Sequence, residues 1–325
     1  MPYIRAPRFS RIDDARNIQI TPRDFSIIER VFRYRLLTSR QIASLAGGSS
    51  QNLLRRLKLL YHCGYLDRPL SQLDYYYSKG SHPIVYALGD RGADLLQVKF
   101  GIPRSEIDWT AKNRSLKRVF LLHTLAVSEI LVQLETSCRK HDIDFTGKEK
   151  SLQKLTGASP DRSVLRWDVS IPFAGTKERV GVVPDYLFGL KLKGSEPVYF
   201  FLEVDRGTMP VMRNNLQQTS LYRKLLAYYE TWRTGLHTSL FGLKRFRVLI
   251  FAASKERVSH LKYANKLLND GKGSGIFLLA DSAGSASGED VLAVPLANGR
   301  DGLTTSLLEE SRTSSDLSVG VEESS

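Results

Sequence analysis

The chain has 325 residues, of which 42% are hydrophobic and 25% charged. This composition excludes a disordered chain, and the length exceeds that of one compact core, so we expect two folded domains. The net charge of +13 favours a polyanionic partner, of which nucleic acid is the commonest inside a cell and an acidic membrane surface the competing one. The two cysteines, Cys63 and Cys138, lack the spacing of a zinc site or a disulfide framework and fit a reducing compartment.

The first 20 residues are basic and irregular, which predicts a flexible arm that orders against phosphates; an untethered terminus is the alternative. They contain no apolar stretch of the kind found in signal peptides. The most apolar helical stretch, at residues 119–134, is too short to span a bilayer. We therefore expect a cytoplasmic protein without membrane contact.

Residues 21–100 have the pattern of a winged helix-turn-helix. Thr21 followed by Pro22 begins a first helix, and Thr38 with Gln41 forms a capping box for a second, which ends at a glycine pair. A third helix follows at residues 49–63, with four leucines expected to face inward, namely Leu53, Leu54, Leu57 and Leu60. Two strands, at residues 65–70 and 83–88, then form the wing, and another helix closes the domain.

In this motif the third helix enters the major groove, so its exposed positions must offer hydrogen-bond donors to bases and phosphates. The wing adds three adjacent tyrosines and a lysine. The alternative is that the polar residues only solvate the helix and that the domain binds a protein. The candidate DNA-binding residues are Ser50, Gln51, Asn52, Arg55, Arg56, Lys58 and Lys79.

The second domain is expected at residues 116–300, after a polar linker at 101–115, and before a disordered, acidic, serine-rich tail at 301–325. It begins with a long amphipathic helix and alternates strands and helices in the order α-β-β-β-α-β, which predicts a mixed sheet flanked by helices. The strands are expected at 164–172, 179–190, 198–205, 247–252 and near Ile276 and Val291, and the helices at 116–139, 212–233 and 255–269.

Carboxylates gather in this second domain. Glu203 and Asp205 lie two residues apart at the end of an apolar strand, so their side chains face the same way, and Asp185 in the preceding strand is a candidate third ligand. Such an all-oxygen set favours Mg²⁺ or Mn²⁺. Glu129 lies on an otherwise apolar helix face; a metal-directed carboxylate and a salt bridge to a basic neighbour such as Lys224 explain it equally well.

Pro184-Asp185 and Glu203-Val204-Asp205 resemble the PD-(D/E)xK nuclease signature. Together with the winged helix, the segment HTLAVSE and the run FFLEVDRGT, the chain is similar to the replication-relaxation family of plasmid and mobile-element proteins. The resemblance implies an α/β (α+β) protein with a nuclease-like mixed-sheet domain, used in plasmid replication or in relaxation of supercoiled DNA. The partners that the resemblance implies are double-stranded DNA, plasmid replication or relaxosome proteins, and a second copy of the chain in a homodimer.

The chain departs from the signature at its third position, where Asp205 stands in place of the usual lysine. That lysine polarises the scissile phosphate or the attacking water, so catalysis is in doubt. Lys224, four residues before Tyr228 on the following helix, is the candidate replacement, and Arg206 is a second one. The candidate catalytic residues are Asp185, Glu203, Asp205, Lys224 and Glu129, and the candidate metal ligands are Asp185, Glu203 and Asp205. The alternative is a winged-helix transcriptional regulator with an inactive nuclease-like domain.

Overall fold

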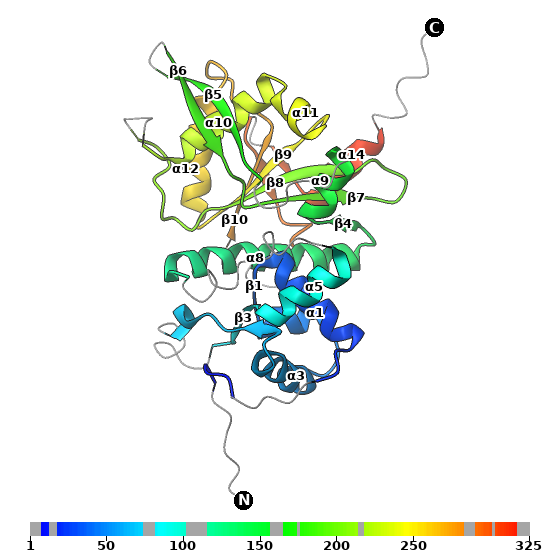
Figure 1. The fold of residues 1–325 in the computed structure, drawn as a ribbon. Helices are drawn as coiled ribbons and strands as arrows, with labels where there is room; N and C mark the ends of the chain where they lie inside the picture. The colour runs from blue at the N-terminus through cyan, green and yellow to red at the C-terminus, as the bar shows by residue number, and fades with distance from the viewer. Residues whose placement is uncertain are drawn as a thin grey trace, which may run out of the picture. The chain divides into compact units, whose positions relative to one another are not determined.

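The protein is described by a computed structural model that covers residues 8–12, 18–73, 82–101, 116–156, 165–173, 176–213, 218–282, 290–300 and 303–316. The chain divides into two compact units, Met1–Val132 and Gln133–Ser325. The division falls inside the long helix α8 (Arg118–Lys140) rather than in the expected linker at 101–115, most of which lies outside the described residues. Figure 1 shows the helices and strands of each unit.

The first unit contains the three expected helices, which are α1 (Pro22–Tyr34), α2 (Ser39–Ala46) and α3 (Ser50–His62). Thr21 and Asp24 form a capping box at the start of α1, and Thr38 and Gln41 form another at the start of α2. Each box satisfies backbone donors that the helix itself leaves free. The turn after α2 is made by Gly47 and Gly48, both at positive φ, as glycine allows at little cost.

The sheet of the first unit is antiparallel, in the order β1-β3-β2, and comprises β1 (Leu36–Thr38), β3 (Val85–Leu88) and β2 (Leu66–Asp67). The sequence did not predict β1, and β2 is shorter than the expected strand at 65–70 because Pro69 offers no backbone donor and a 3-10 turn, Leu70–Gln72, follows it. Helix α5 (Asp90–Phe100) comes after β3. The described residues of this unit thus combine the helices α1, α2, α3 and α5 with a small antiparallel sheet; the assignment as a winged helix-turn-helix stays a prediction.

Arg68, directly after β2, is a buried cation in this unit. Its guanidinium lies over the ring of Tyr61, 4.0 Å from the centroid, and donates to the hydroxyl of Tyr86 at 3.0 Å. It also donates to the backbone carbonyl of Arg8, and Arg11 donates to the carbonyl of Tyr61 at 3.1 Å. The described part of the basic arm, residues 8–12, is therefore bound to the unit through its own backbone and side chains.

Helix α8 has 23 residues, which is long and apolar enough to cross a membrane, so the expectation that this stretch is too short was wrong. Half of its most apolar window is nevertheless buried inside the protein. Core helices of soluble proteins have the same length and composition, so length and apolarity alone are weak evidence for a membrane segment.

A seven-stranded mixed sheet forms the second unit, in the order β12-β11-β10-β9-β8-β7-β4. The central strands β8, β9 and β10 run parallel, and the remaining neighbours pair antiparallel. A separate hairpin consists of β5 (Trp167–Phe173) and β6 (Thr176–Val182). The strands of the large sheet are β4 (Asp144–Thr146), β7 (Tyr186–Lys191), β8 (Val198–Val204), β9 (Arg247–Ala252), β10 (Phe277–Asp281), β11 (Leu296–Asn298) and β12 (Thr304–Thr305).

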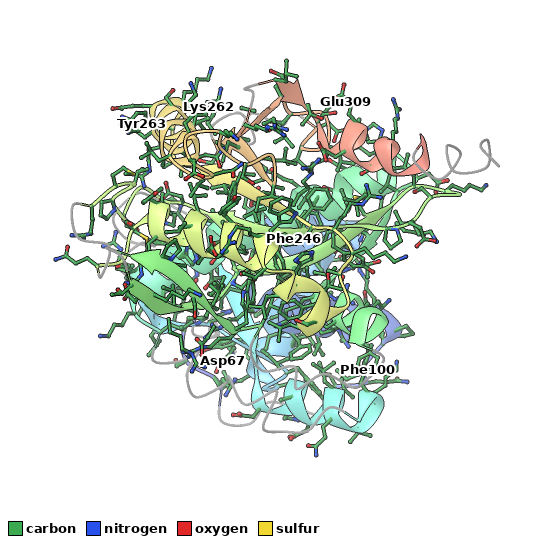
Figure 2. The ribbon with its side chains drawn as sticks, turned by 90° about the horizontal axis from the view of Figure 1, so that it is seen from above. Asp67, Phe100, Phe246, Lys262, Tyr263 and Glu309 are labelled. Carbon is green, nitrogen blue, oxygen red and sulfur yellow. The ribbon has the colours of Figure 1, made fainter. Side chains whose placement is uncertain are left out.

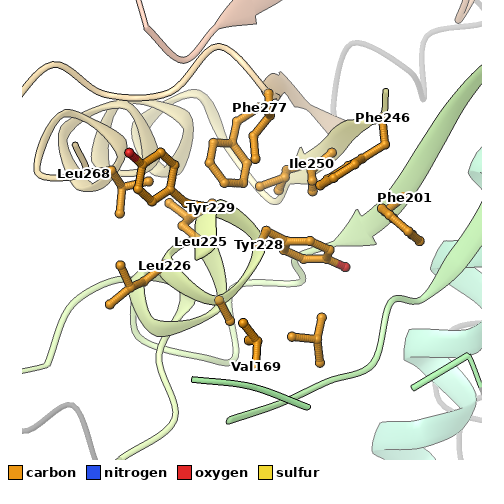
Figure 3. Close-up of a cluster of buried hydrophobic side chains, with 14 of the residues drawn as sticks. Val169, Phe201, Leu225, Leu226, Tyr228, Tyr229, Phe246, Ile250, Leu268 and Phe277 are labelled. Carbon is orange, nitrogen blue, oxygen red and sulfur yellow. The ribbon is translucent and has the colours of Figure 1, made fainter. Parts of the chain in front are cut away.

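The core of this unit lies between the sheet and helix α10 (Leu221–Arg233). Figure 3 shows the side chains of α10 beside those of the central strands, with Tyr228 near Phe201 and Ile250. The indole of Trp167, from the hairpin, packs on Phe201 and donates to the hydroxyl of Thr231 at 2.9 Å. The other helices are α9 (Lys148–Thr156), α11 (Leu236–Phe241), α12 (Lys255–Lys266) and α14 (Leu307–Asp316).

Several element boundaries differ from those expected. The single strand expected at 179–190 is two strands, β6 and β7, because Pro184 cannot donate to a ladder. Helix α10 begins at Leu221, after the cap Ser220, rather than at Met212. Val291 lies in a turn, and β11 follows it.

The expected disordered tail at 301–325 was wrong for residues 304–316, which form β12 and α14. Leu307 is fully buried, and Glu310 pairs with Arg247 of β9 at 3.0 Å. Apolar and ionic contacts with the rest of the unit thus outweigh the polar composition. Residues 317–325 lie outside the described part of the chain.

Candidate functional site

Helix α3 exposes one polar face. Leu53, Leu57 and Leu60 are buried, while the opposite face carries exposed side chains. At 100° per residue, Gln51, Leu54, Arg55 and Lys58 lie within about a quarter turn of one another; all four are exposed. Leu54, expected inward, is 49% exposed because it falls between the exposed and the buried stripes. Ser50 and Asn52, at the start of the helix, are exposed as well.

Arg56 does not share that exposed face. Its guanidinium donates to both carboxylate oxygens of Asp24, at 2.8 and 2.6 Å, and to the carbonyl of Gln19 at 2.6 Å. Burial alone would raise the pKa of Asp24, but hydrogen bonds from Arg56 and Thr21 outweigh it and lower this pKa below its ordinary value. Arg56 therefore neutralises the buried capping residue of α1, and its expected role as a DNA contact stays a prediction.

Lys79 and the three wing tyrosines, Tyr75, Tyr76 and Tyr77, lie outside the described residues. The wing contribution to binding accordingly stays a prediction.

Glu129 of α8 is not a buried carboxylate. It is exposed, and it accepts a hydrogen bond of 2.6 Å from the side-chain nitrogen of Gln41, within the first unit. The expectation of a buried, metal-directed Glu129 was wrong because helical periodicity shows which residues share a face but not what covers it. The contact with Gln41 links α8 to the capping residue of α2.

Glu203 and Asp185 meet on one face of the large sheet. Tyr186 pairs with Leu202 in the antiparallel register of β7 and β8, so the next residues outward, Asp185 and Glu203, lie opposite each other. The backbone N–H of Asp185 donates to the carbonyl of Leu202 at 3.1 Å, and its carboxylate accepts from the N–H of Val204 at 2.8 Å. The expected proximity of these two carboxylates is thus present.

Two side chains from α10 hold the carboxylate of Glu203. Lys224 forms an ion pair with one oxygen, and the hydroxyl of Tyr228 donates to the other at 2.5 Å. Lys224 and Tyr228 are four residues apart, so they lie on one face of the helix, which is the spacing on which the sequence prediction rested. The expected delivery of a lysine from the following helix therefore matches the geometry.

Burial is the largest single influence on the pKa values of Glu203, Lys224 and Tyr228. Glu203 is 6% exposed, and loss of solvation raises the pKa of Glu203 to about 7, against the opposing effect of Lys224 and with a further increase from Asp185. Burial alone would lower the pKa of Lys224, but the Glu203 and Asp185 carboxylates raise it, so the ammonium keeps its proton. Burial also raises the pKa of Tyr228 well above its ordinary value, which keeps this hydroxyl a donor.

Asp205 has a different partner. Its carboxylate forms an ion pair with Arg257 in the first turn of α12 and accepts from the N–H of Gly207 at 2.9 Å. Arg257 also donates to the carbonyl of Met209 at 2.6 Å. Asp205 thus fixes the loop after β8, and the expected triad of Asp185, Glu203 and Asp205 does not assemble. Across the described ranges, no group of three or more His, Cys, Asp or Glu side chains has the geometry to hold a metal ion.

Arg257 is the site residue that sequence reasoning missed. It lies far along the chain from Asp205, and no local motif connects them. The parallel register of β8 and β9, in which Val204 pairs with Phe251, brings the end of β8 next to the start of α12. Another pair with the four-residue spacing in this part of the chain, Gln218 and Tyr222, does not hold Glu203; Gln218 accepts from Arg213 at 2.6 Å instead.

The described residues thus define an α/β protein in which a helical unit with a small antiparallel sheet precedes a mixed-sheet unit, where Lys224 and Tyr228 hold the buried Glu203. The profile of the replication-relaxation family matches residues 29–243, well over half of the chain. The protein therefore belongs to the replication-relaxation family. No curated protein and no solved structure matches the chain.

Proposed function

We propose that the protein binds double-stranded DNA, in the replication or relaxation of a plasmid or mobile element, and that α3 is its recognition helix. The observation that carries the proposal is the exposed face of Gln51, Arg55 and Lys58, with Ser50 and Asn52 at its amino-terminal end. Amide and guanidinium groups at this spacing suit base edges and phosphates in a major groove. The family membership and the charge of +13 support the same role.

The test is a binding titration over a range of salt concentrations, with plasmid-derived duplex fragments. Arg55→Ala combined with Lys58→Ala should lower affinity at least about tenfold and lower the slope of log affinity against log salt by about 2, as expected for the loss of two phosphate contacts. The matched control is Lys193→Ala combined with Lys244→Ala, which removes two exposed lysines of the second unit. Equal affinity of the α3 variant and the wild type would refute the placement of the recognition helix.

A second candidate function is metal-dependent DNA nicking, in line with the resemblance to PD-(D/E)xK nucleases. It is favoured by Asp185 opposite Glu203 with Lys224 next to them. Mg²⁺ is often held by only one or two carboxylates with water completing its shell, so Asp185 and Glu203 fit Mg²⁺ or Mn²⁺, although Asp205 does not join them. The bound ion would offset charge on the phosphate, and Lys224 would supply the cation that the third signature position lacks.

Nicking is tested with supercoiled plasmid and Mg²⁺ or Mn²⁺. Metal-dependent nicking that is lost in Asp185→Ala and in Glu203→Ala, with fragment binding unchanged, would support an enzyme. Its absence in the wild type, with salt-sensitive binding intact, would favour the alternative of a winged-helix regulator with an inactive nuclease-like unit. The proposed location is the cytoplasm, and relaxosome or plasmid replication proteins and a homodimer partner belong to the same proposal.

A further inference from the structure

Helix α12 (Lys255–Lys266) carries a line of lysines on one face. Lys255, Lys262 and Lys266 are separated by seven and four residues, so they project within about 40° of one direction. Ser259 and Tyr263 lie along the same side. Lys255, Ser259, Tyr263 and Lys266 are exposed, and Figure 2 shows Lys262 and Tyr263 next to each other on the outer side of this helix.

This lysine line differs from the charged faces of α1 and α10. Opposite charges alternate on α1, where Glu29 pairs with Arg33, and on α10, where Glu230 pairs with Arg233. Such pairs solvate a helix without attracting a partner. The one acidic residue of α12, Glu256, is exposed and lies about 100° around the helix from the lysines, on the side of Tyr263. Within the described ranges none of the three lysines takes part in an ion pair.

The opposite side of α12 packs against the loop after β8. Arg257, in the first turn of α12, pairs with Asp205, and at 100° per residue it lies about 160° around the helix from the lysine line. The lysine line therefore faces away from that loop. It extends about 16 Å from Lys255 to Lys266, at 1.5 Å per residue, which matches the distance across several phosphates of a DNA strand.

Tyr263 gives this surface a second kind of contact. Its side chain is 62% exposed, although an aromatic ring of this size usually finds a packing partner. Aromatic rings flanked by cations are the arrangement on which proteins stack unpaired bases while holding the adjacent phosphates. With the net charge of +13, this combination favours a nucleic-acid strand as the occupant of the surface.

We propose that the lysine line of α12, with Tyr263, is a second DNA-binding surface that holds a strand by its phosphates. It rests on the proposed DNA-binding function and adds a contact that α3 does not provide. The two units would then engage DNA independently, one in the groove and one along the backbone.

The test is lysine acetylation of the full chain, followed residue by residue by mass spectrometry, with and without saturating plasmid-derived DNA. DNA should slow the acetylation of Lys255, Lys262 and Lys266 at least about threefold, while Lys193 and Lys244, exposed lysines outside α12, should react at unchanged rates. Unchanged rates on α12 in a sample where DNA is bound would overturn this inference and leave the role of α3 intact.

A binding titration provides the second measurement. Changing the three lysines of the line to alanine should lower the salt slope by about 3 for duplex DNA; no change in slope would overturn the inference. Tyr263→Ala, but not Tyr263→Phe, should weaken single-strand binding about fivefold or more, in keeping with about 1–3 kcal/mol for a stacked base. A wild type without any DNA affinity would refute both this inference and the proposed function.

Discussion

Glu203→Gln separates two descriptions of the buried group, a stabilising ion pair and a carboxyl whose ionisation is costly. Glutamine has nearly the same shape as a protonated glutamic acid, so it keeps the contact with Tyr228 and removes the titration. It also removes the carboxylate that pairs with Lys224, so the change of the stability difference with pH, rather than its absolute size, reports the titration. In the wild type the buried carboxyl loses solvation, which raises the pKa of Glu203 from 4.5 to about 7. The Glu203→Gln variant has no carboxyl at this position, so it loses no stability through ionisation of this group as the pH rises.

The sign and size follow from proton linkage. A carboxyl with a raised folded-state pKa stabilises the fold fully below pH 4.5, where both states are protonated, and this stability is lost as the pH rises through about 7. The difference between 4.5 and about 7 corresponds to about 3 kcal/mol of unfolding free energy. The unfolding free energy of Glu203→Gln, relative to that of the wild type, should therefore rise by most of this amount between pH 5 and pH 8.

The assay is urea unfolding followed by tryptophan fluorescence, because Trp167 packs against Tyr228 and reports directly on this core. Lys224→Met should move the pH window upward, since it removes the ammonium that favours the ionised carboxylate. If the stability difference between wild type and Glu203→Gln is flat or falls with pH, Glu203 is an ordinary stabilising ion-pair partner and the reasoning from burial is wrong.

Three further substitutions test the first unit, each by circular-dichroism melting. Arg56→Met should lower the unfolding free energy by about 3 kcal/mol, because it leaves the buried carboxylate of Asp24 without its guanidinium; a loss below 0.5 kcal/mol would contradict this role. Gly92→Ala should cost about 3 kcal/mol or prevent folding, because the added methyl group would lie 2.2 Å from the carbonyl oxygen of Tyr65; a melting curve like that of the wild type would refute the close approach. Leu54→Gln should change the unfolding free energy by less than about 0.5 kcal/mol, because this leucine is 49% exposed. A large loss of stability would instead show that Leu54 packs in the core.

The features that sequence analysis predicted correctly depend on neighbours in the chain. The N-cap Thr21 with Pro22, and the capping box of Thr38 and Gln41, are each contained within four residues, and the starts of their helices followed from them. The spacing of Lys224 and Tyr228 likewise fixed a shared helix face, and both side chains of that face contact Glu203. Local geometry was sufficient in each of these cases.

The features that were missed or misassigned depend on contacts between distant parts of the chain. Arg257 reaches Asp205 only through the parallel pairing of β8 with β9, which no spacing in the sequence reveals. Arg56 was indistinguishable from Arg55 until α3 was placed beside the capping residue Asp24. The contact between Glu129 and Gln41 likewise depends on the packing of α8 against α2, two helices that are distant in the sequence. Propensity and periodicity do not contain this information, because it arises from the packing of elements against one another.

The arginine sandwiched between Tyr61 and Tyr86 has a practical consequence for shortened versions of the protein. Arg68 receives one of its hydrogen-bond acceptors, the carbonyl of Arg8, from a stretch that lies before the first helix. A fragment trimmed to begin at Thr21 would contain every helix and strand of the first unit yet leave that charge without this acceptor. The carbonyl of Arg8 thus helps to satisfy a buried cation, and the smallest fragment that keeps this contact should start no later than residue 8.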